Sequence, residues 1–172
     1  AVKTPGSSIF PYLSENLDDI ITVEDEELVV AFLDMVENHK MVVENSGLLT
    51  VAALKHLDLK GKKAVAILSG GNMDVITMSS VVQQGLILRN RIFTVSVLLP
   101  DKPGELSRVA DVIAKENGNV IKLEHNQFVS INRNAAVELR ITLEAFGTEH
   151  KNQIIDALKE NGYQPKVVRT NI

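Results

Sequence analysis

The 172-residue sequence contains no cysteine and no tryptophan. Without cysteine there can be no disulfide framework, no thiol nucleophile and no thiolate metal site, and nothing in the composition indicates a secreted, oxidising habitat. No apolar run approaches the roughly 18–20 residues that a membrane-spanning helix needs, and residues 1–6 do not have the pattern of a signal peptide. We therefore expect no membrane partner and a cytoplasmic location.

Basic residues and aromatic residues are also too few and too scattered for a nucleic-acid surface. Residues 1–88 hold six Lys/Arg against twelve Asp/Glu, whereas residues 89–172 hold twelve against ten. Binding of single-stranded nucleic acid would need a basic groove with interleaved aromatic side chains, so we expect no nucleic-acid partner. The four histidines show no metal-ligand spacing, so we expect no metal site. The change in charge places a domain boundary near residues 88–91.

The first half predicts helices mixed with short strands. Residues 18–23 are rich in β-branched side chains and predict a strand. A helix should follow, with Thr22 as its cap, Asp25 as the acid of a capping box, and one apolar face that includes Phe32 and Leu33. Residues 73–84 predict a further helix.

Two segments of the first half are more apolar than a surface position allows. Residues 48–57 form a helix pattern that is apolar almost all round, which indicates burial on every side. Residues 63–68 form a continuous apolar run, which is typical of a parallel strand covered on both faces. Since two strands make a poor sheet by themselves, this half should need a covering partner.

The sequence Ser69-Gly70-Gly71-Asn72 follows the second predicted strand. Open α/β sheets place their ligands at the carboxyl ends of their strands. Glycines let the backbone approach a ligand closely, and a following helix offers free N–H groups. A plain strand-to-helix turn that uses glycine for its dihedral angles explains the same spacing, so both interpretations stay open.

The second half predicts the order β-α-β-β-α-β, with strands near 93–99, 120–129, 136–145 and 164–169. In the third strand Val137, Leu139, Ile141 and Leu143 alternate with polar residues, so one face should be buried. Asn132-Arg133-Asn134 predicts a turn, and Thr148 should cap the second helix. Asn117-Gly118 should end the first helix and Gly162 the second, because these residues favour positive φ. This order is the split βαβ, ferredoxin-like arrangement, which can bury its own core.

The loop after the first of these strands, Asp101-Lys102-Pro103-Gly104, leads directly into a helix. A tight loop with glycine at a helix N-terminus exposes backbone N–H groups that can receive a carboxylate. A rigid turn without a ligand explains the loop equally well.

Taken together, these residues resemble a known family. Residues 1–6, 18–23 and 42–44, with the sequence Leu68-Ser69-Gly70-Gly71-Asn72, look like the end of the catalytic domain of threonine ammonia-lyase, a fold-type-II pyridoxal-phosphate (PLP) enzyme. Residues 93–168, with Asp101-Lys102-Pro103-Gly104, look like an ACT domain, a regulatory module that binds amino acids. The resemblance implies a catalytic portion at 1–88 and an ACT domain at 91–172.

The resemblance also implies which residues would contact the cofactor. Ser69 matches the serine that hydrogen-bonds the pyridine nitrogen of PLP, and Gly70, Gly71 and Asn72 match the turn beside the ring. Glu44 matches a glutamate that borders the cofactor site, although the following Asn45-Ser46-Gly47 departs from the usual family pattern. The family's Schiff-base lysine and its tetraglycine phosphate loop have no counterpart here. We therefore expect a carboxyl-terminal fragment, inactive alone and without catalytic residues, which fits its start at Ala1 rather than at methionine.

For the ACT portion the resemblance implies an amino-acid effector, isoleucine or else valine, bound where two domains meet. It also implies a homo-oligomer formed through ACT–ACT pairing, in contact with the remainder of the catalytic domain. The matching effector-binding residues are Asp101, Pro103, Gly104, Asn119 and Val120. Two alternatives are a stand-alone amino-acid-binding regulatory module and a relative of serine dehydratase or racemase.

Overall fold

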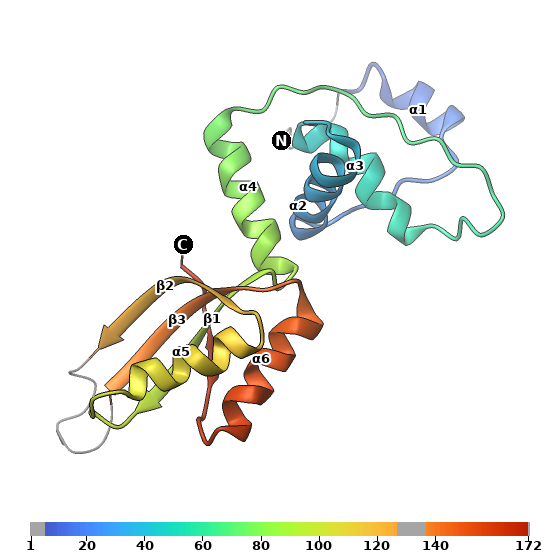
Figure 1. The fold of residues 1–172 in the computed structure, drawn as a ribbon. Helices are drawn as coiled ribbons and strands as arrows, with labels where there is room; N and C mark the ends of the chain where they lie inside the picture. The colour runs from blue at the N-terminus through green and yellow to red at the C-terminus, as the bar shows by residue number, and fades with distance from the viewer. Residues whose placement is uncertain (1–5, 127–136, 172) are drawn as a thin grey trace.

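The computed structural model describes residues 6–126 and 137–171 of the chain. Its first half is a group of helices joined by irregular segments, and its second half is a sheet with two helices (Figure 1). The first-half elements are α1 (Phe10–Asn16), α2 (Asp25–Asp34), the π-helical turn η1 (Met35–His39), α3 (Asn45–Ala53), the 3-10 turn η2 (Leu54–His56) and α4 (Val75–Leu88). The second-half elements are β1 (Ile92–Leu99), α5 (Glu105–Lys115), β2 (Asn119–Asn126), β3 (Val137–Glu144), α6 (Thr148–Glu160) and β4 (Lys166–Val168).

Helix α2 begins later than the sequence predicts. Its N-cap is Glu24, and the Glu27 carboxylate accepts the Glu24 backbone N–H at 2.9 Å. The assignment of Thr22 as the cap was wrong, because the Glu24–Glu27 spacing forms the same three-residue box two positions further on. The predicted apolar face is confirmed, since Phe32 and Leu33 are buried.

The two strands predicted for the first half are wrong. Residues 18–23 and 63–68 belong to no sheet among the described residues. A parallel strand exists only where neighbouring strands accept and donate its backbone hydrogen bonds, and no neighbour is present in the described part of the chain. The consequence is exposure of apolar side chains, 90% for Val65 and 71% for Ile67.

Helix α3 is buried on one side only. Leu48 and Ala52 lie in a small core with Phe32 of α2 and Val81 of α4, as predicted for an apolar helix. Leu49, however, exposes 46% of its surface, so the expectation of burial on every side is not met. Among the described residues, α2 and α4 pack against the side of α3 that carries Leu48 and Ala52, and the side that carries Leu49 lies in solvent.

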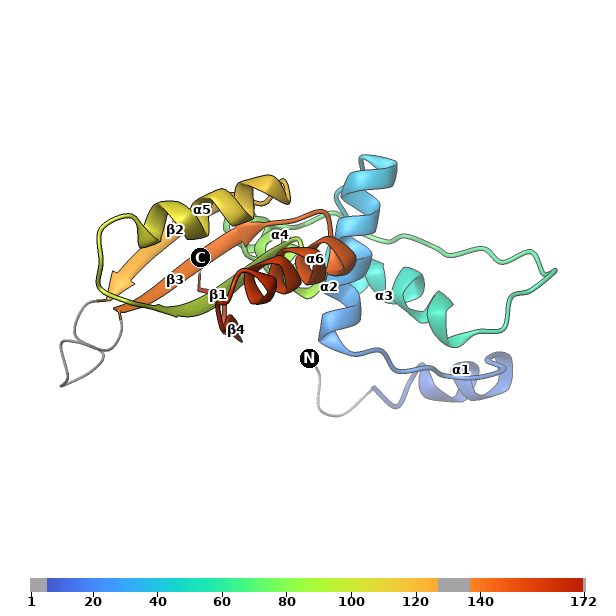
Figure 2. The same cartoon turned by 60° about the horizontal axis from the view of Figure 1, so that its bottom comes forward.

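The second half has the predicted ferredoxin-like topology. The sheet order is β2-β3-β1-β4, and each neighbouring pair is antiparallel. Strand β3 therefore lies between β1 and β2, which is the split βαβ arrangement. Helices α5 and α6 both cover one face of this sheet (Figures 1 and 2).

The core of the second half follows the alternation of its strands. The predicted inward set of β3 is confirmed, because all four side chains are at most 3% exposed. Three of these side chains, Leu139, Ile141 and Leu143, pack with the odd-numbered residues of β1 against α5 and α6 in a single cluster. Its most deeply buried members are Val95, Val97, Val109, Ile113, Leu139, Ile141, Leu143, Ile154 and Leu158.

The ends of the helices in this half agree with the sequence in part. Asn117 (φ +59°) and Gly162 (φ +87°) adopt the left-handed conformation at the ends of α5 and α6, as predicted. The assignment of Thr148 as the cap of α6 was wrong, because Gly147 is the N-cap and Thr148 is the first helical residue. The Thr148 hydroxyl instead accepts a hydrogen bond from Asn90 Nδ2 at 3.0 Å. The predicted turn at Asn132-Arg133-Asn134 lies outside the described residues.

Two arginines join the halves where α4 passes into β1. Arg89 and Arg91 both form ion pairs with Glu37, at 3.2 Å for Arg89, and Arg89 also pairs with Asp34. Arg89 Nη2 further donates to the carbonyl of Val30 at 3.3 Å. Because these groups are half-buried, the guanidinium groups hold the end of α2 and η1 against the start of the sheet.

None of the helices in the described ranges combines the length and the apolar character needed to cross a membrane.

Leu139→Ala should lower the free energy of unfolding by about 2–5 kcal/mol, because it leaves a cavity in the sheet–helix core. Leu98→Ala, on the neighbouring strand but 54% exposed, should change it by no more than about 0.5 kcal/mol. Urea unfolding followed by circular dichroism measures both variants. Equal losses would contradict the assignment of the two sheet faces.

Candidate functional site

The structure brings together the two segments expected to border a cofactor. The Asn72 backbone N–H donates to Glu44 Oε2 at 3.0 Å, and the Glu44 N–H donates to the carbonyl of Gly70 at 3.4 Å. Glu44 is the N-cap of α3, and it is half-buried, while residues 69–72 are exposed. A carboxylate 25 residues or more away in the sequence therefore shapes the Ser69–Asn72 turn.

Two glycines make this approach possible. A Cβ on Gly70, where φ is +81°, would lie 2.4 Å from Glu44 Oε1. A Cβ on Gly47, in the first turn of α3, would lie 2.1 Å from the carbonyl oxygen of Ser69. The backbones of the turn and of the start of α3 therefore lie in direct contact. Only glycine, which has no Cβ, allows them to come this close.

Ser46 is a contributor that the sequence did not single out. Its hydroxyl donates to Glu44 Oε1 at 2.6 Å, so it orients the carboxylate that receives Asn72. Ser46 falls within Asn45-Ser46-Gly47, the segment that departs from the family pattern. The sequence offered one signal for this role, a serine two residues after a glutamate. The sequence does not show that this glutamate also accepts the Asn72 N–H, because that contact depends on the fold of the turn.

Asp74 is a second residue that the sequence did not single out. Its carboxylate accepts the backbone N–H groups of Ile76 (3.0 Å) and Thr77 (2.9 Å) at the start of α4. These are the N–H groups that the sequence suggested for a ligand, so they are already occupied. A ligand at this turn can use the hydroxyl of Ser69 and the backbone of residues 69–72.

The capping bonds also set the ionisation of Asp74. The hydrogen bond from the Thr77 hydroxyl, followed by the backbone bond from Thr77, lowers the pKa of this carboxyl. Both bonds favour the charged form, which also interacts well with the positive end of a helix.

The residues present fit one end of PLP. The Ser69 hydroxyl can donate a hydrogen bond to a pyridine nitrogen or accept one from its protonated form. The glycine turn is exposed, so no side chain prevents a flat ring from contacting its backbone. No hydrogen bond occupies the Ser69 hydroxyl within the described ranges. The lysine and the phosphate-binding loop that such enzymes also need have no counterpart among these residues.

The five residues expected to bind an effector lie in two separate places. Asp101, Pro103 and Gly104 are exposed in the loop between β1 and α5, where Gly104 is the N-cap with φ +91°. Asn119 and Val120 are exposed at the start of β2. Asn119 Nδ2 donates to Glu144 Oε2 at 3.1 Å.

These two places are at opposite ends of the sheet. Asn119 pairs with Glu144, and Glu144 pairs with Ile92, the first residue of β1. The β1–α5 loop instead follows Leu99, the last residue of β1. At about 3.3 Å per residue the separation along the strand is ~20 Å or more. One amino acid cannot contact both places in a single copy of the chain.

Gly70→Ala should destabilise the chain more than Gly61→Ala, which is the matched control. Both glycines have positive φ, but a Cβ at Gly61 meets no atom within 4 Å. The strain of about 1–2 kcal/mol at positive φ is common to both, and Gly70→Ala should lose about 1 kcal/mol more by displacing Glu44. Urea unfolding gives the two free energies. Faster exchange of the Asn72 amide in Gly70→Ala alone identifies the broken bond, and unchanged exchange would contradict it.

Asp74 should make the stability of α4 depend on pH in the acid range. Because its pKa is lowered in the folded chain, its stabilising effect is present above the unfolded pKa and is lost as the pH falls through the folded value. Wild type should exceed Asp74→Asn in thermal stability at neutral pH, and this difference should shrink on acidification. Thermal unfolding from pH 7 to pH 2 measures it, and a pH-independent difference would contradict the capping role.

Comparison with known proteins places these sites in a family context. No protein-family model matches the chain. The chain is 37% identical to the L-threonine ammonia-lyase of Geobacter sulfurreducens, over 98% of this chain and 42% of that protein. It is 31% identical to the L-threonine ammonia-lyase of Thermotoga maritima, over the same two shares. It is 28% identical to the biosynthetic L-threonine dehydratase of Escherichia coli, over 95% of this chain and 32% of that protein.

Two solved structures are similar to part of this chain. The ACT domain of prephenate dehydrogenase from Bacillus anthracis is 25% identical with a TM-score of 0.34, over 42% of this chain and 99% of that one. Prephenate dehydratase from Streptococcus mutans is 19% identical with a TM-score of 0.38, over 44% of this chain and 40% of that one.

The chain spans less than half the length of these curated relatives. The part that it matches is their carboxyl-terminal part. The resemblance to the threonine ammonia-lyases is therefore confirmed along nearly the whole of this chain, which corresponds to the carboxyl-terminal portion of those enzymes.

Proposed function

We propose that this chain is the carboxyl-terminal portion of a PLP-dependent threonine ammonia-lyase, which converts threonine to 2-oxobutanoate and ammonia in the cytoplasm. Its domains would be the end of the catalytic domain (1–88) and an ACT domain (91–172). The observation that carries the proposal is the placement of Glu44 beside the Ser69–Asn72 turn, in a chain 37% identical to such an enzyme. Two segments that the resemblance assigns to one cofactor site lie in contact.

Ser69 would hold the pyridine nitrogen of the cofactor. When bound, PLP withdraws electrons from the amino-acid substrate, which makes proton loss and departure of the β-hydroxyl group possible. A neutral hydroxyl, unlike a carboxylate, leaves the ring nitrogen mostly unprotonated and so moderates this effect. Gly70 and Gly71 would let the backbone approach the ring, while Glu44 and Asn72 keep the turn in shape.

The chain alone would be inactive. It has no lysine in the Schiff-base context of the family and no tetraglycine loop for the phosphate, and a PLP enzyme needs both. The preceding part of the catalytic domain would supply them. It would also cover apolar side chains that are now in solvent, notably Val65, Ile67, Val75 and Ile76, which are 71–90% exposed.

The second half would sense an amino acid, most simply isoleucine or valine, between two copies of the domain. Strand β2 is an edge strand whose residues are all exposed, so it is free to pair with a second β2. Antiparallel pairing about a two-fold axis would bring the start of β2 in one copy to the end of β2 in the other. That end lies on the same side of the sheet as Leu99 and the loop.

This pairing would therefore assemble one effector site from two copies. Asn119 and Val120 of the second copy would approach Asp101, Pro103 and Gly104 of the first. The exposed N–H groups at the start of α5 would receive the effector carboxylate. The separation of the two groups within one chain, by the length of a strand, supports a shared site.

A hybrid enzyme tests the catalytic part of the proposal. This chain replaces the matching 42% of the Geobacter sulfurreducens enzyme, and threonine deamination and cofactor absorbance are measured. Ser69→Ala should lower kcat about tenfold, the effect of one hydrogen bond to the cofactor. Ser80→Ala, whose exposed hydroxyl only donates to the Ile76 carbonyl at 3.1 Å, is the matched control and should keep full activity.

A hybrid that folds and binds PLP but does not deaminate threonine would overturn the assigned reaction. Cofactor absorbance and threonine turnover by the 172-residue chain alone would overturn its proposed inactivity. Equal activity of the Ser69→Ala and Ser80→Ala hybrids would overturn the role of Ser69.

A further inference from the structure

Two helices of the first half begin at an acidic N-cap, and their two carboxylates have different partners. Asp74 caps its own helix, because it accepts the backbone N–H groups of Ile76 and Thr77 at the start of α4. The Glu44 side chain accepts none of the N–H groups at the start of α3, all of which the structure describes. This carboxylate is therefore available to a segment other than its own helix.

Ser46 gives the Glu44 carboxylate its direction. The Ser46 hydroxyl donates to Glu44 Oε1 at 2.6 Å, and the Asn72 backbone N–H donates to Oε2 at 3.0 Å. The terminal torsion of a glutamate side chain is broad, so one hydrogen bond alone would leave the carboxylate free to rotate. Two bonds, one at each oxygen, fix its plane. The hydroxyl therefore keeps Oε2 directed at the turn rather than at the start of α3.

The start of α3 does not depend on this carboxylate. The backbone carbonyl of Glu44 accepts the N–H groups of Gly47 at 2.9 Å and of Leu48 at 3.1 Å. Because the backbone closes the first turn of the helix, α3 can keep its shape when the Ser46 hydroxyl is removed. Loss of this hydroxyl should therefore affect the turn at residues 69–72 more than it affects α3.

The first turn of α3 contacts both ends of the turn at residues 69–72. At one end Gly47 lies against the Ser69 carbonyl, which a Cβ on Gly47 would approach to 2.1 Å. At the other end Ser46 orients the carboxylate that receives the last N–H of the turn. This carboxylate also lies against Gly70, since a Cβ there would be 2.4 and 3.0 Å from its two oxygens. A rotation of the carboxylate would therefore disturb the backbone that carries the Ser69 hydroxyl.

We propose that Ser46 is a positioning residue of the cofactor site. Its hydroxyl holds Glu44 in the orientation that keeps the turn, and with it the Ser69 hydroxyl, in place to meet the pyridine ring. This inference rests on the proposed catalytic function of residues 1–88. Ser46 lies in Asn45-Ser46-Gly47, the segment that departs from the family pattern, so the resemblance does not imply this role.

Amide exchange in the 172-residue chain, followed by nuclear magnetic resonance, tests the contact without any cofactor. In Ser46→Ala the Asn72 N–H should exchange about fivefold faster, which corresponds to the loss of one hydrogen bond of ordinary strength. Ser46→Thr keeps a hydroxyl at this position and should restore slow exchange. Ser80→Ala, which removes an exposed hydroxyl from α4, is the matched control and should leave the exchange of Asn72 unchanged.

The hybrid enzyme tests the effect on the cofactor site. Ser46→Ala should lower kcat for threonine about threefold, less than Ser69→Ala does, because Ser46 acts through Glu44 and does not itself contact the cofactor. The KM for threonine should stay within about twofold of the parent value, because uniform substrate binding is not changed. Ser46→Thr should recover the lost kcat. A lower kcat with an unchanged KM and an unchanged free energy of unfolding distinguishes a positioning role from a general loss of stability.

A double-variant cycle tests whether Ser46 acts through Glu44. In a Glu44→Ala background, Ser46→Ala should have no further effect on kcat or on the exchange of Asn72, because the group that the hydroxyl orients is absent. Additive effects of the two substitutions would overturn the proposed route from Ser46 to the turn.

The two measurements separate this inference from the proposed function. Unchanged exchange of Asn72 in Ser46→Ala would overturn the inference, whether or not the hybrid is active. Faster exchange with an unchanged kcat would overturn the role of Ser46 in the cofactor site. Faster exchange with a folded hybrid that does not deaminate threonine would overturn the assigned reaction and still support the positioning of the turn by Ser46.

Discussion

Pairing of backbone hydrogen bonds between strands is the constraint on which both halves of this chain depend. In residues 92–168 each strand finds an antiparallel neighbour, and the sheet then presents one continuous apolar face to α5 and α6. In the first half, residues 63–68 have the composition of a buried strand but no neighbouring strand among the described residues. An extended segment without neighbours cannot form a sheet, so its apolar side chains lie in solvent.

The candidate cofactor turn is consequently held by side chains and glycine contacts rather than by a sheet. Glu44 receives the Asn72 N–H and, through Gly70, fits closely against the turn. Gly47 lets the first turn of α3 reach the Ser69 carbonyl. These contacts keep Ser69 exposed beside Glu44, so the turn keeps its shape although no sheet forms next to it.

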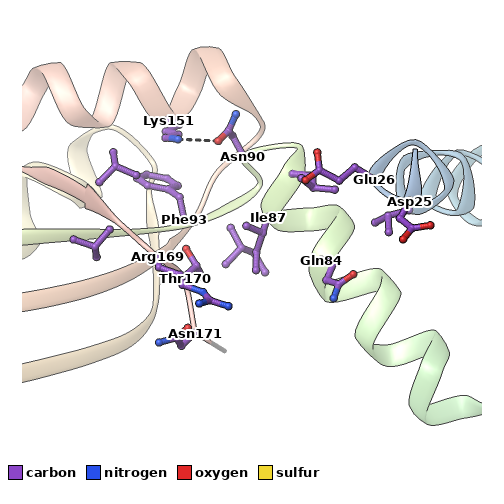
Figure 3. Close-up of a pocket in the computed structure, with 15 residues that line it drawn as sticks. Asp25, Glu26, Gln84, Ile87, Asn90, Phe93, Lys151, Arg169, Thr170 and Asn171 are labelled. Carbon is purple, nitrogen blue, oxygen red and sulfur yellow. Dashed lines mark hydrogen bonds between the residues drawn. The ribbon is translucent and has the colours of Figure 1, made fainter. Parts of the chain in front are cut away.

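Charge connects the two halves. Arg89 and Arg91 lie in the short linker between α4 and β1, and both form ion pairs with Glu37 of η1. These ion pairs hold the linker in one conformation. A cavity of about 720 Å³ lies beside this linker (Figure 3). Its carboxylates, Asp25 and Glu26, belong to the first half, and its cationic groups, Lys151 and Arg169, belong to the second. Two parts of a chain can influence one another only through such shared contacts, because a ligand must favour one relative arrangement over another.

The sequence by itself determined the second half almost completely. Alternation in residues 137–143, the glycine after α6 and the order of its elements predicted a sheet, two helices and their buried faces, because all of these depend on local periodicity. From the resemblance to a family it also predicted Ser69–Asn72 and Glu44 as neighbours of a cofactor. Only the tertiary structure decided that residues 18–23 and 63–68 form no strands, that Ser46 orients Glu44 beside the turn, and that Asp74 caps α4. Each of these depends on which distant segments become neighbours, and a local pattern does not contain that information.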